Sequence, residues 1–154
     1  MWDAQSKIIR TDSGNEDFRQ LVKHLDRELA VFDGDDHAYY AQYNGLHSIK
    51  HALVYYVEDM AVGCGSFKKF DDESVEIKRM YVKELFRKQG IARKILQELE
   101  NWAYENDYKY SVLETGKRQM EAIGLYMKSG YEVITNYGQY MEMENSVCMR
   151  KKLN

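Results

Sequence analysis

Two cationic residues, Arg87 and Lys88, and the glycine Gly90 stand just before an amphipathic stretch that begins at Ile91. The first turn of a helix carries backbone N–H groups without intrahelical partners, and the peptide dipoles make its potential positive. A glycine lets a ligand approach these N–H groups closely, because it has no side chain. The pattern is typical of a phosphate or pyrophosphate site. A solvated loop before a helix would use the same residue types, so both interpretations stay open on these residues alone.

Two well-known phosphate-binding loops do not fit this stretch. A P-loop needs a second glycine followed by Lys-Ser or Lys-Thr, and neither is present. A dinucleotide fingerprint needs several glycines inside a βαβ unit, whereas this loop has one glycine and follows three strand-like runs.

The elements that must position the loop follow from hydrophobic periodicity. Asn15 or Ser13 can cap the first predicted helix, and Gly130 can end the last one. The three strands between residues 51 and 82 predict an antiparallel meander, and the whole pattern predicts an α+β fold with helices packed on a mostly antiparallel sheet. Helices are predicted over 12–30, 91–103 and 118–130, and strands over 6–11, 51–57, 61–70, 75–82, 108–115, 131–135 and 146–153.

Length and composition limit the classes of function. A chain of 154 residues suits one domain over 1–154. The net charge of −3 gives no reason to expect nucleic acid as a partner. Cys64 and Cys148 are too few for a disulfide framework, and the four histidines lack a metal-ligand spacing, so we expect reduced thiols and no metal. No apolar run has membrane-spanning length, and we expect a cytoplasmic protein without membrane contact.

Two sequence motifs together resemble a known family. "RKQGIA", residues 87–92, is similar to the Gln/Arg-x-x-Gly-x-Gly/Ala motif of the GNAT superfamily, the Gcn5-related N-acetyltransferases. "QMEAIGLYMKSGY", residues 119–131, resembles the family's Asn-x-x-Ala-x-x-Leu-Tyr-x-x-x-Gly-Phe pattern, with Gln119 in place of the asparagine. The tail over 136–153 looks like the small-molecule branch. The motif regions cover about the C-terminal half of the chain, and the resemblance implies a GNAT-like sheet of six to seven strands with helices on both faces.

The resemblance also implies acetyl-CoA as co-substrate. Its pyrophosphate would bind the backbone amides of the 87–92 loop, and its pantetheine arm would pair with the end of the 75–82 strand. The thioester would then lie in a gap between that strand and the strand over 110–115. The cofactor contacts that the family implies are Met80, Tyr81, Val82, Arg87, Lys88, Gln89, Gly90, Ile91, Ala92, Arg93, Gln119 and Tyr126.

Three residues are candidates for the chemistry of acetyl transfer, which needs a base for the amine and an acid for the departing thiolate. Tyr126 matches the family tyrosine that serves as general acid, although a tyrosine packed on the sheet would look the same. Glu76 matches the position of the glutamate base in histone-type members, and Glu114 that in ribosomal-protein acetyltransferases. Either carboxylate can be the base, or water alone carries the proton away.

We therefore expect direct transfer of acetyl from acetyl-CoA to a primary amine of a small molecule. A non-catalytic acyl-CoA sensor and a protein-interaction domain are the alternatives, and a homodimer is left open. The acidic and aromatic segment over 32–43 predicts a cationic acceptor, since carboxylates and tyrosine faces both attract an ammonium group. The residues expected to wall the acceptor site are Asp33, Asp35, Asp36, Tyr39, Tyr40, Tyr43, Tyr137 and Tyr140.

Overall fold

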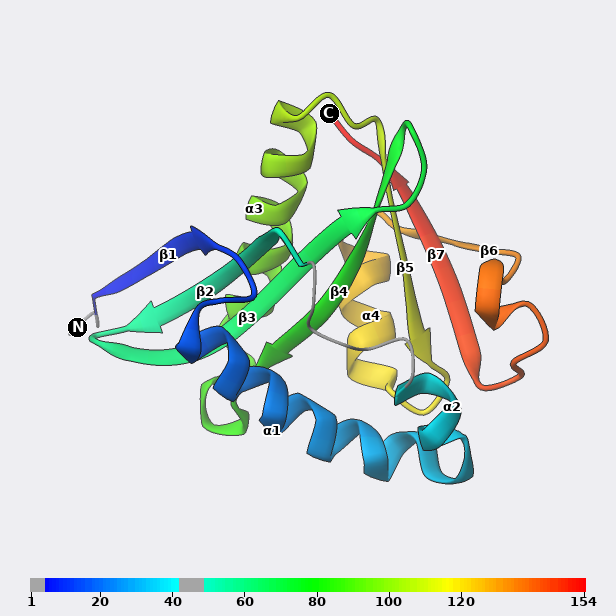
Figure 1. Cartoon of the computed structure of the whole chain (residues 1–154), viewed down its shortest axis with the longest axis horizontal. Helices are drawn as coiled ribbons and strands as arrows, with labels where there is room; N and C mark the ends of the chain where they lie inside the picture. Colours follow the sequence, from blue (N-terminus) through cyan, green and yellow to red (C-terminus); the bar gives the residue numbers. More distant parts are fainter. Residues whose placement is uncertain (1–4, 42–48) are drawn as a thin grey trace.

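A computed structural model describes residues 5–41 and 49–154 of the chain. Its seven strands form one sheet in the order β1-β2-β3-β4-β5-β7-β6 (Figure 1). Every neighbouring pair is antiparallel except β4 and β5, which run parallel. The strands are β1 (Ser6–Thr11), β2 (His51–Val57), β3 (Met60–Lys69), β4 (Ser74–Val82), β5 (Tyr110–Gly116), β6 (Glu132–Ile134) and β7 (Ser146–Lys152).

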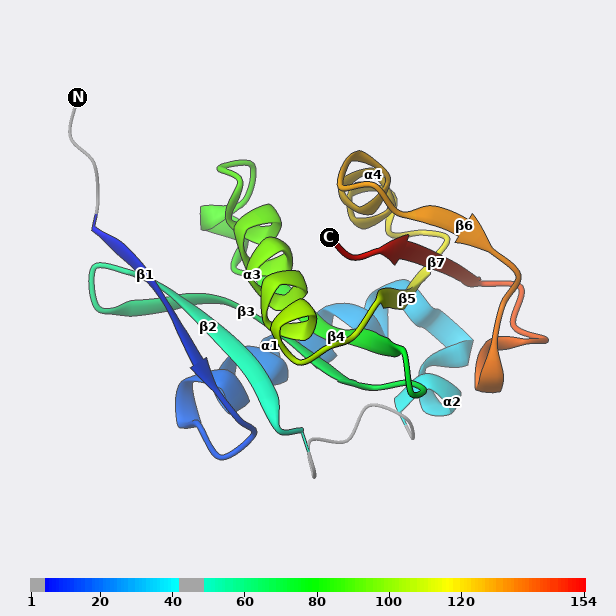
Figure 2. The ribbon, with the colours of Figure 1, turned by 90° about the horizontal axis from the view of Figure 1, so that it is seen from above.

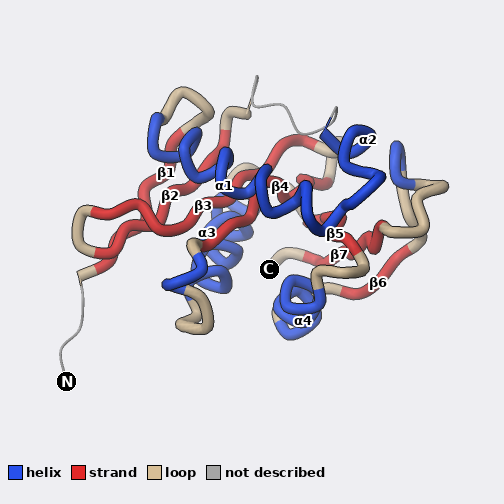
Figure 3. Tube along the Cα trace, turned by 90° about the horizontal axis from the view of Figure 1, so that it is seen from below, coloured by secondary structure: helices blue, strands red, loops and turns tan. Residues whose placement is uncertain are grey.

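Helices cover both faces of the sheet (Figures 2 and 3). α1 (Glu16–Asp33) and the short α2 (His37–Ala41) lie on one face, and α3 (Ile91–Glu105) and α4 (Met120–Lys128) lie on the other. Three single 3₁₀ turns, η1 (Gly34–Asp36), η2 (Glu84–Phe86) and η3 (Gly138–Tyr140), complete the described elements. No helix in the described ranges is long and apolar enough to cross a membrane.

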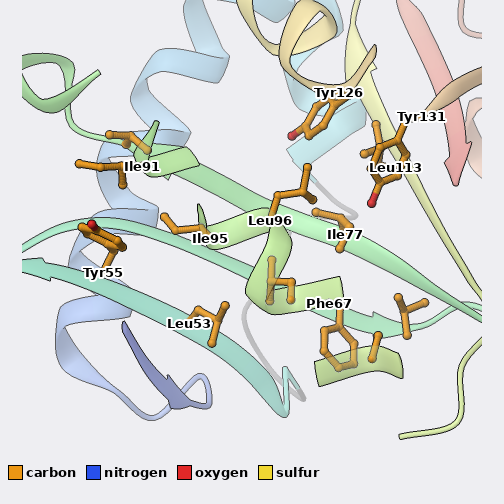
Figure 4. Packing of buried hydrophobic residues seen from close by; sticks show 14 of the residues in the cluster. Leu53, Tyr55, Phe67, Ile77, Ile91, Ile95, Leu96, Leu113, Tyr126 and Tyr131 are labelled. Carbon is orange, nitrogen blue, oxygen red and sulfur yellow. The ribbon is translucent and has the colours of Figure 1, made fainter. Parts of the chain in front are cut away.

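The alternation of side chains along β2 divides the core between these two faces. Leu53 and Tyr55 join the large cluster under α3, whereas Val54 and Tyr56 join the cluster under α1. Figure 4 shows the larger cluster, in which side chains from α3 interdigitate with those of the sheet. The strand β3 lies close to α3 at Gly65, where an added Cβ would come within 3 Å of side chains on β4 and α3.

The sheet splits at β4 and β5, the one parallel pair among the described strands. β4 and β5 are in register only from Ser74 to Glu76 and from Tyr110 to Val112, near the start of each strand. Further along, β4 carries one residue more than β3 between Lys78 and Tyr81, and Arg79 within this bulge has a φ of +62°. A bulge bends its strand. The second half of β4 and the second half of β5 are therefore unpaired with each other, which opens a V-shaped gap in the sheet.

Most predicted elements are confirmed, and so is the predicted fold class. Of the two candidate caps, Asn15 is the one used, since its Oδ1 accepts a hydrogen bond from Phe18 N at 2.9 Å. Gly130 follows α4 with a φ of +98°, as expected for the residue after a helix end. For the segment over 32–43 the sequence indicates an acidic turn and then an irregular tyrosine-rich stretch; its described part forms the end of α1, η1 and α2. Tyr43 lies outside the described residues.

Candidate active site

A cavity of about 90 Å³ opens where β4 and β5 diverge. Residues from both faces of the sheet line it, and they belong to α1, α2, β4, β5, α4, η3 and the residue before α4. Its lining residues are Leu25, Leu29, Asp33, Tyr40, Ile77, Lys78, Arg79, Met80, Glu114, Thr115, Gly116, Gln119, Tyr126 and Tyr140. The gap that the family resemblance implied between these two strands therefore exists, and two of the three predicted catalytic residues line it.

Glu114, on β5, is held by a short chain of hydrogen bonds. Ser146 Oγ on β7 lies 2.8 Å from Glu114 Oε2 and donates to it, and the hydroxyl of Tyr40 lies 2.7 Å from the same Ser146 Oγ. Burial raises the pKa of Glu114 to about 7, although the Ser146 hydrogen bond and the charge of Lys78 both lower it. A carboxyl with a pKa near neutrality can both accept and release a proton at physiological pH.

Glu76, on β4, is occupied elsewhere. Its side chain is 3% exposed, accepts a hydrogen bond from the Tyr137 hydroxyl at 2.7 Å, and lies 3.7 Å from Lys68 Nζ. It is absent from the cavity lining. The structure thus separates the two carboxylates that the sequence left equal: Glu114 faces the cavity, and Glu76 ties β4 to the loop before η3.

Tyr126, on α4, is buried at 6% exposure and lines the cavity. Its ring packs against Tyr131 at 5.9 Å between centroids, and Figure 4 shows both side chains beside β5. Among the described residues, none donates to or accepts from its hydroxyl. Burial, and then the charge of Glu114, raises the pKa of Tyr126 well above that of a free tyrosine. The phenol is therefore protonated at neutral pH and can donate.

Two cationic residues that the sequence did not single out also line the cavity. Burial lowers the pKa of Lys78 despite nearby carboxylates, and its Nζ donates to the Tyr140 hydroxyl at 3.3 Å. Arg79 Nη1 donates to Asp26 Oδ1 on α1 at 2.7 Å. The available signal was the adjacent Lys-Arg pair inside a strand, "EIKRMYV", where Ile77 and Met80 flank it. Ser146 was missed as well, because a serine at a strand start has no distinguishing pattern.

The predicted acceptor wall is partly assembled. Asp33, Tyr40 and Tyr140 line the cavity. Burial raises the pKa of Asp33, while nearby His37 lowers it. Other residues of this predicted set stay outside the lining: Asp35 and Asp36 belong to η1, Tyr39 donates to the Gln139 carbonyl, and Tyr137 is bonded to Glu76.

The basic loop forms an open helix N-terminus. Gly90 has a φ of +82° with space for a Cβ, and the first helical hydrogen bond runs from Lys94 N to Gly90 O. The N–H groups of Ile91, Ala92 and Arg93 therefore have no intrahelical partner, and no side chain caps them. The side chains of Lys88, Gln89 and Arg93 are exposed.

Arg87 is turned away from this helix terminus. Its Nε donates to the Val82 carbonyl at 2.7 Å, and its Nη2 lies 2.7 and 2.9 Å from the two oxygens of Glu28 on α1. The guanidinium therefore fastens the loop to β4 and α1. Of the two cations before Gly90, Arg87 is bonded within the fold and Lys88 is exposed to solvent.

On its gap side, β4 has no strand partner beyond the bulge among the described residues. Lys83 N donates to Val62 O, so the ladder alternation directs the peptide groups of Tyr81 toward β3 and those of Val82 toward the gap, where the Val82 carbonyl accepts from Arg87 Nε. Gln119 begins α4 and lines the cavity at the opposite side of the gap. Of the predicted cofactor residues, Met80, Gln119 and Tyr126 line the cavity, whereas Arg87 and the peptide groups of Tyr81 are directed elsewhere.

This arrangement is accompanied by a match to a known family over most of the chain. Residues 18–131 match the Acetyltransferase (GNAT) family. The chain belongs to the GNAT acetyltransferase family. The cavity of this GNAT chain lies where the parallel strands β4 and β5 diverge.

Two named relatives are similar in sequence. The IAA acetyltransferase of Azospirillum brasilense is 33% identical over 143 residues, which are 87% of this chain and 89% of that relative. The uncharacterised N-acetyltransferase YsnE of Bacillus subtilis (strain 168) is 34% identical over 97 residues, 62% of this chain. The match covers 64% of YsnE's own length, slightly less than two thirds.

Two solved structures share the fold. A candidate acyl-CoA N-acyltransferase from Klebsiella pneumoniae superposes with a TM-score of 0.81 at 27% identity, over 99% of this chain and 100% of that one. A GNAT acetyltransferase from Elizabethkingia anophelis with acetyl-CoA bound gives a TM-score of 0.68 at 19% identity, over 96% and 98% of the two chains.

We predict that Ser146→Ala raises the pKa of Glu114 above its wild-type value of about 7, because the lost hydroxyl stabilises the ionised carboxylate. An NMR titration with ¹³C-labelled glutamate measures this pKa. Ser129→Ala is the matched control, since the Ser129 hydroxyl donates to the Leu125 carbonyl in α4, and it should leave the titration unchanged. A wild-type Glu114 that titrates near its ordinary value of 4.5 would contradict the prediction.

Proposed function

We propose that this GNAT protein transfers an acetyl group from acetyl-CoA to a primary amine by direct attack, with Glu114 as base and Tyr126 as acid. The observation that carries the proposal is that these two side chains, one titrating near neutrality and one protonated, line the same cavity. The acetyl-CoA bound to the Elizabethkingia anophelis structure supports the choice of co-substrate.

The described residues suggest a path for acetyl-CoA. The N–H groups of Ile91, Ala92 and Arg93 would hold the pyrophosphate, with the exposed Lys88 adding charge. The peptide groups of Met80 and the N–H of Val82 would pair with the pantetheine arm as an added strand does, while the Val82 carbonyl bonds Arg87 Nε. Arg87 acts on this path indirectly, by holding the loop against Glu28.

Each group then has one task in the transfer. The acceptor enters as an ammonium ion, attracted by Asp33 and Glu114, and loses a proton to the Glu114 carboxylate. The free amine attacks the thioester carbon, and the C–S bond breaks. The departing thiolate takes the proton of Tyr126, and Tyr126 regains one from the nitrogen of the new amide through solvent. Glu114 returns its proton to bulk water, so protons and charges balance.

Two other functions remain as alternatives on the same fold. A non-catalytic acyl-CoA sensor would bind acetyl-CoA without turnover, and a protein-interaction domain would not bind it. The neutral-range pKa of Glu114 favours the enzyme, because a sensor has no need of a base in its ligand cavity. An acetyl-CoA turnover screen over a panel of amines, with thiol release as readout, distinguishes all three.

The first test separates the two carboxylates. In the wild type, kcat/KM should fall as pH drops below about 7, because Glu114 becomes protonated and stops acting as a base. Glu114→Gln should lower kcat/KM about a hundredfold or more and abolish this acidic limb. Glu76→Gln is the matched control and should keep the limb, since its carboxylate bonds Tyr137 outside the cavity. Equal, intact limbs in both variants would favour water as the only proton carrier.

The second test removes one hydroxyl. Tyr126→Phe should lower kcat roughly a hundredfold and leave acetyl-CoA affinity nearly unchanged, because it removes the acid and keeps the packing. Tyr131→Phe is the comparison on the neighbouring ring: its hydroxyl bonds Glu100 and Ser111 away from the cavity, so it should affect stability more than kcat. A Tyr126→Phe enzyme within about threefold of wild type would exclude Tyr126 as the acid.

The third test concerns the loop. Gly90→Asp should weaken acetyl-CoA binding by about 2 kcal/mol or more, since it puts a carboxylate beside the expected pyrophosphate. Gly90→Ala is the control, because it imposes the same strain at φ +82° without the charge. Calorimetry measures both. Equal affinities for the folded Asp and Ala variants would sink the pyrophosphate assignment.

A further inference from the structure

We infer that the acceptor carries a carboxylate next to its amine and that Arg79 binds this carboxylate, so the substrate is a small amino acid or a similar zwitterion. The inference rests on the proposed function for the role of the cavity as an acceptor site. It is carried by Arg79 itself, a residue to which the transfer chemistry assigns no task.

Arg79 is placed in the cavity at a conformational cost. It sits in the bulge of β4 with a φ of +62°, a left-handed conformation that a long side chain rarely adopts. Backbone strain of this kind is destabilising and concentrates at functional sites. The side chain is only 4% exposed and lines the cavity.

The hydrogen bonds of the Arg79 guanidinium are incomplete. Nη1 donates to Asp26 Oδ1, a carboxylate that is itself half exposed. Nε is fully buried and has no partner among the described residues. A buried N–H without an acceptor is destabilising, and the carboxylate of a bound ligand would supply the acceptor that Nε lacks. Nε and Nη2 form the edge of the guanidinium that a carboxylate binds with two parallel hydrogen bonds.

The charges around the cavity match a zwitterion better than a dication. Asp33 and Glu114 supply the negative groups, and Lys78 and Arg79 supply the positive ones. An ammonium group beside Glu114 and a carboxylate at Arg79 would pair both signs, whereas a second ammonium group would meet Lys78 or Arg79. The acidic segment alone predicts an acceptor with an ammonium group. Because Lys78 and Arg79 share the cavity with Asp33 and Glu114, the inferred acceptor carries a carboxylate as well.

The experiment compares matched acceptors. For each of a panel of small α- and β-amino acids, kcat/KM is measured beside that of its carboxamide and its decarboxylated amine, corrected for the fraction of free amine. We expect the acids to be preferred by about tenfold or more, because a site that hydrogen-bonds a substrate group discriminates strongly against analogues without it. A wild-type enzyme that uses the amides or simple amines equally well overturns the inference.

Two variants assign the preference to Arg79. Arg79→Gln should remove the preference for acids, since it deletes the charge and the guanidinium edge. Asp26→Asn is the matched control: it breaks the same ion pair but leaves the guanidinium, so it should keep the preference. If Arg79→Gln fails to fold, the wild-type ranking and Asp26→Asn still decide the matter. Loss of the preference in Asp26→Asn would contradict a direct role for Arg79.

A binding measurement separates this inference from the proposed activity. Calorimetry on the wild-type chain with CoA compares each N-acetylated acid with its N-acetylated amide. A preference for the acids without any turnover would refute the acetyl transfer and keep the carboxylate site. Turnover of amines without any preference for acids would keep the acetyl transfer and refute the carboxylate site. Absence of binding by every acid also refutes it.

Discussion

The candidate site depends on a parallel strand contact that is only three residues long on each strand. Once β4 and β5 separate after Glu76 and Val112, the sheet has an internal edge, and such an edge leaves peptide groups without partners. Two features follow from that edge: the second half of β4 has no strand partner on its gap side among the described residues, and the gap beside it becomes the cavity. A continuous sheet would have neither feature, however well its residues matched a family pattern.

A split sheet needs other bonds to hold its two parts together. On the α3 face, the apolar cluster continues across the gap, since Ile77 of β4 and Leu113 of β5 both belong to it. A buried polar group adds to this on the same face: Glu100 of α3 accepts from Lys151 Nζ of β7 at 2.7 Å and from the Tyr131 hydroxyl at 2.9 Å. Because breaking a buried, hydrogen-bonded pair is strongly destabilising, this junction resists separation of the two parts.

The basic residues of the chain have unlike roles that depend on their partners rather than on their type. Arg87 bonds a carboxylate and a carbonyl, and therefore stiffens the loop that precedes α3. Lys88 is solvated and remains available to an anion. Arg79 is buried with one N–H unsatisfied, an unfavourable state that a bound carboxylate would relieve. The partners of each cation, and not its type, therefore distinguish Arg87, which is bonded within the fold, from Lys88 in solvent and from Arg79 with its buried Nε.

The sequence by itself determined what depends on local interactions: the elements, the cap at Asn15, the turn at Gly130 and the loop whose N–H groups begin α3. It also contained the two motifs that identified the family. Only the tertiary structure places Glu114 at the cavity and Glu76 away from it, because two glutamates on neighbouring strands look alike until their partners across the sheet are known. The same holds for Arg87 and Glu28, which are 59 residues apart, and for Arg79, whose position follows from the register shift between β3 and β4. Periodicity reports which face a residue prefers, whereas pairing, bulges and burial decide which groups meet and which charges stay unpaired.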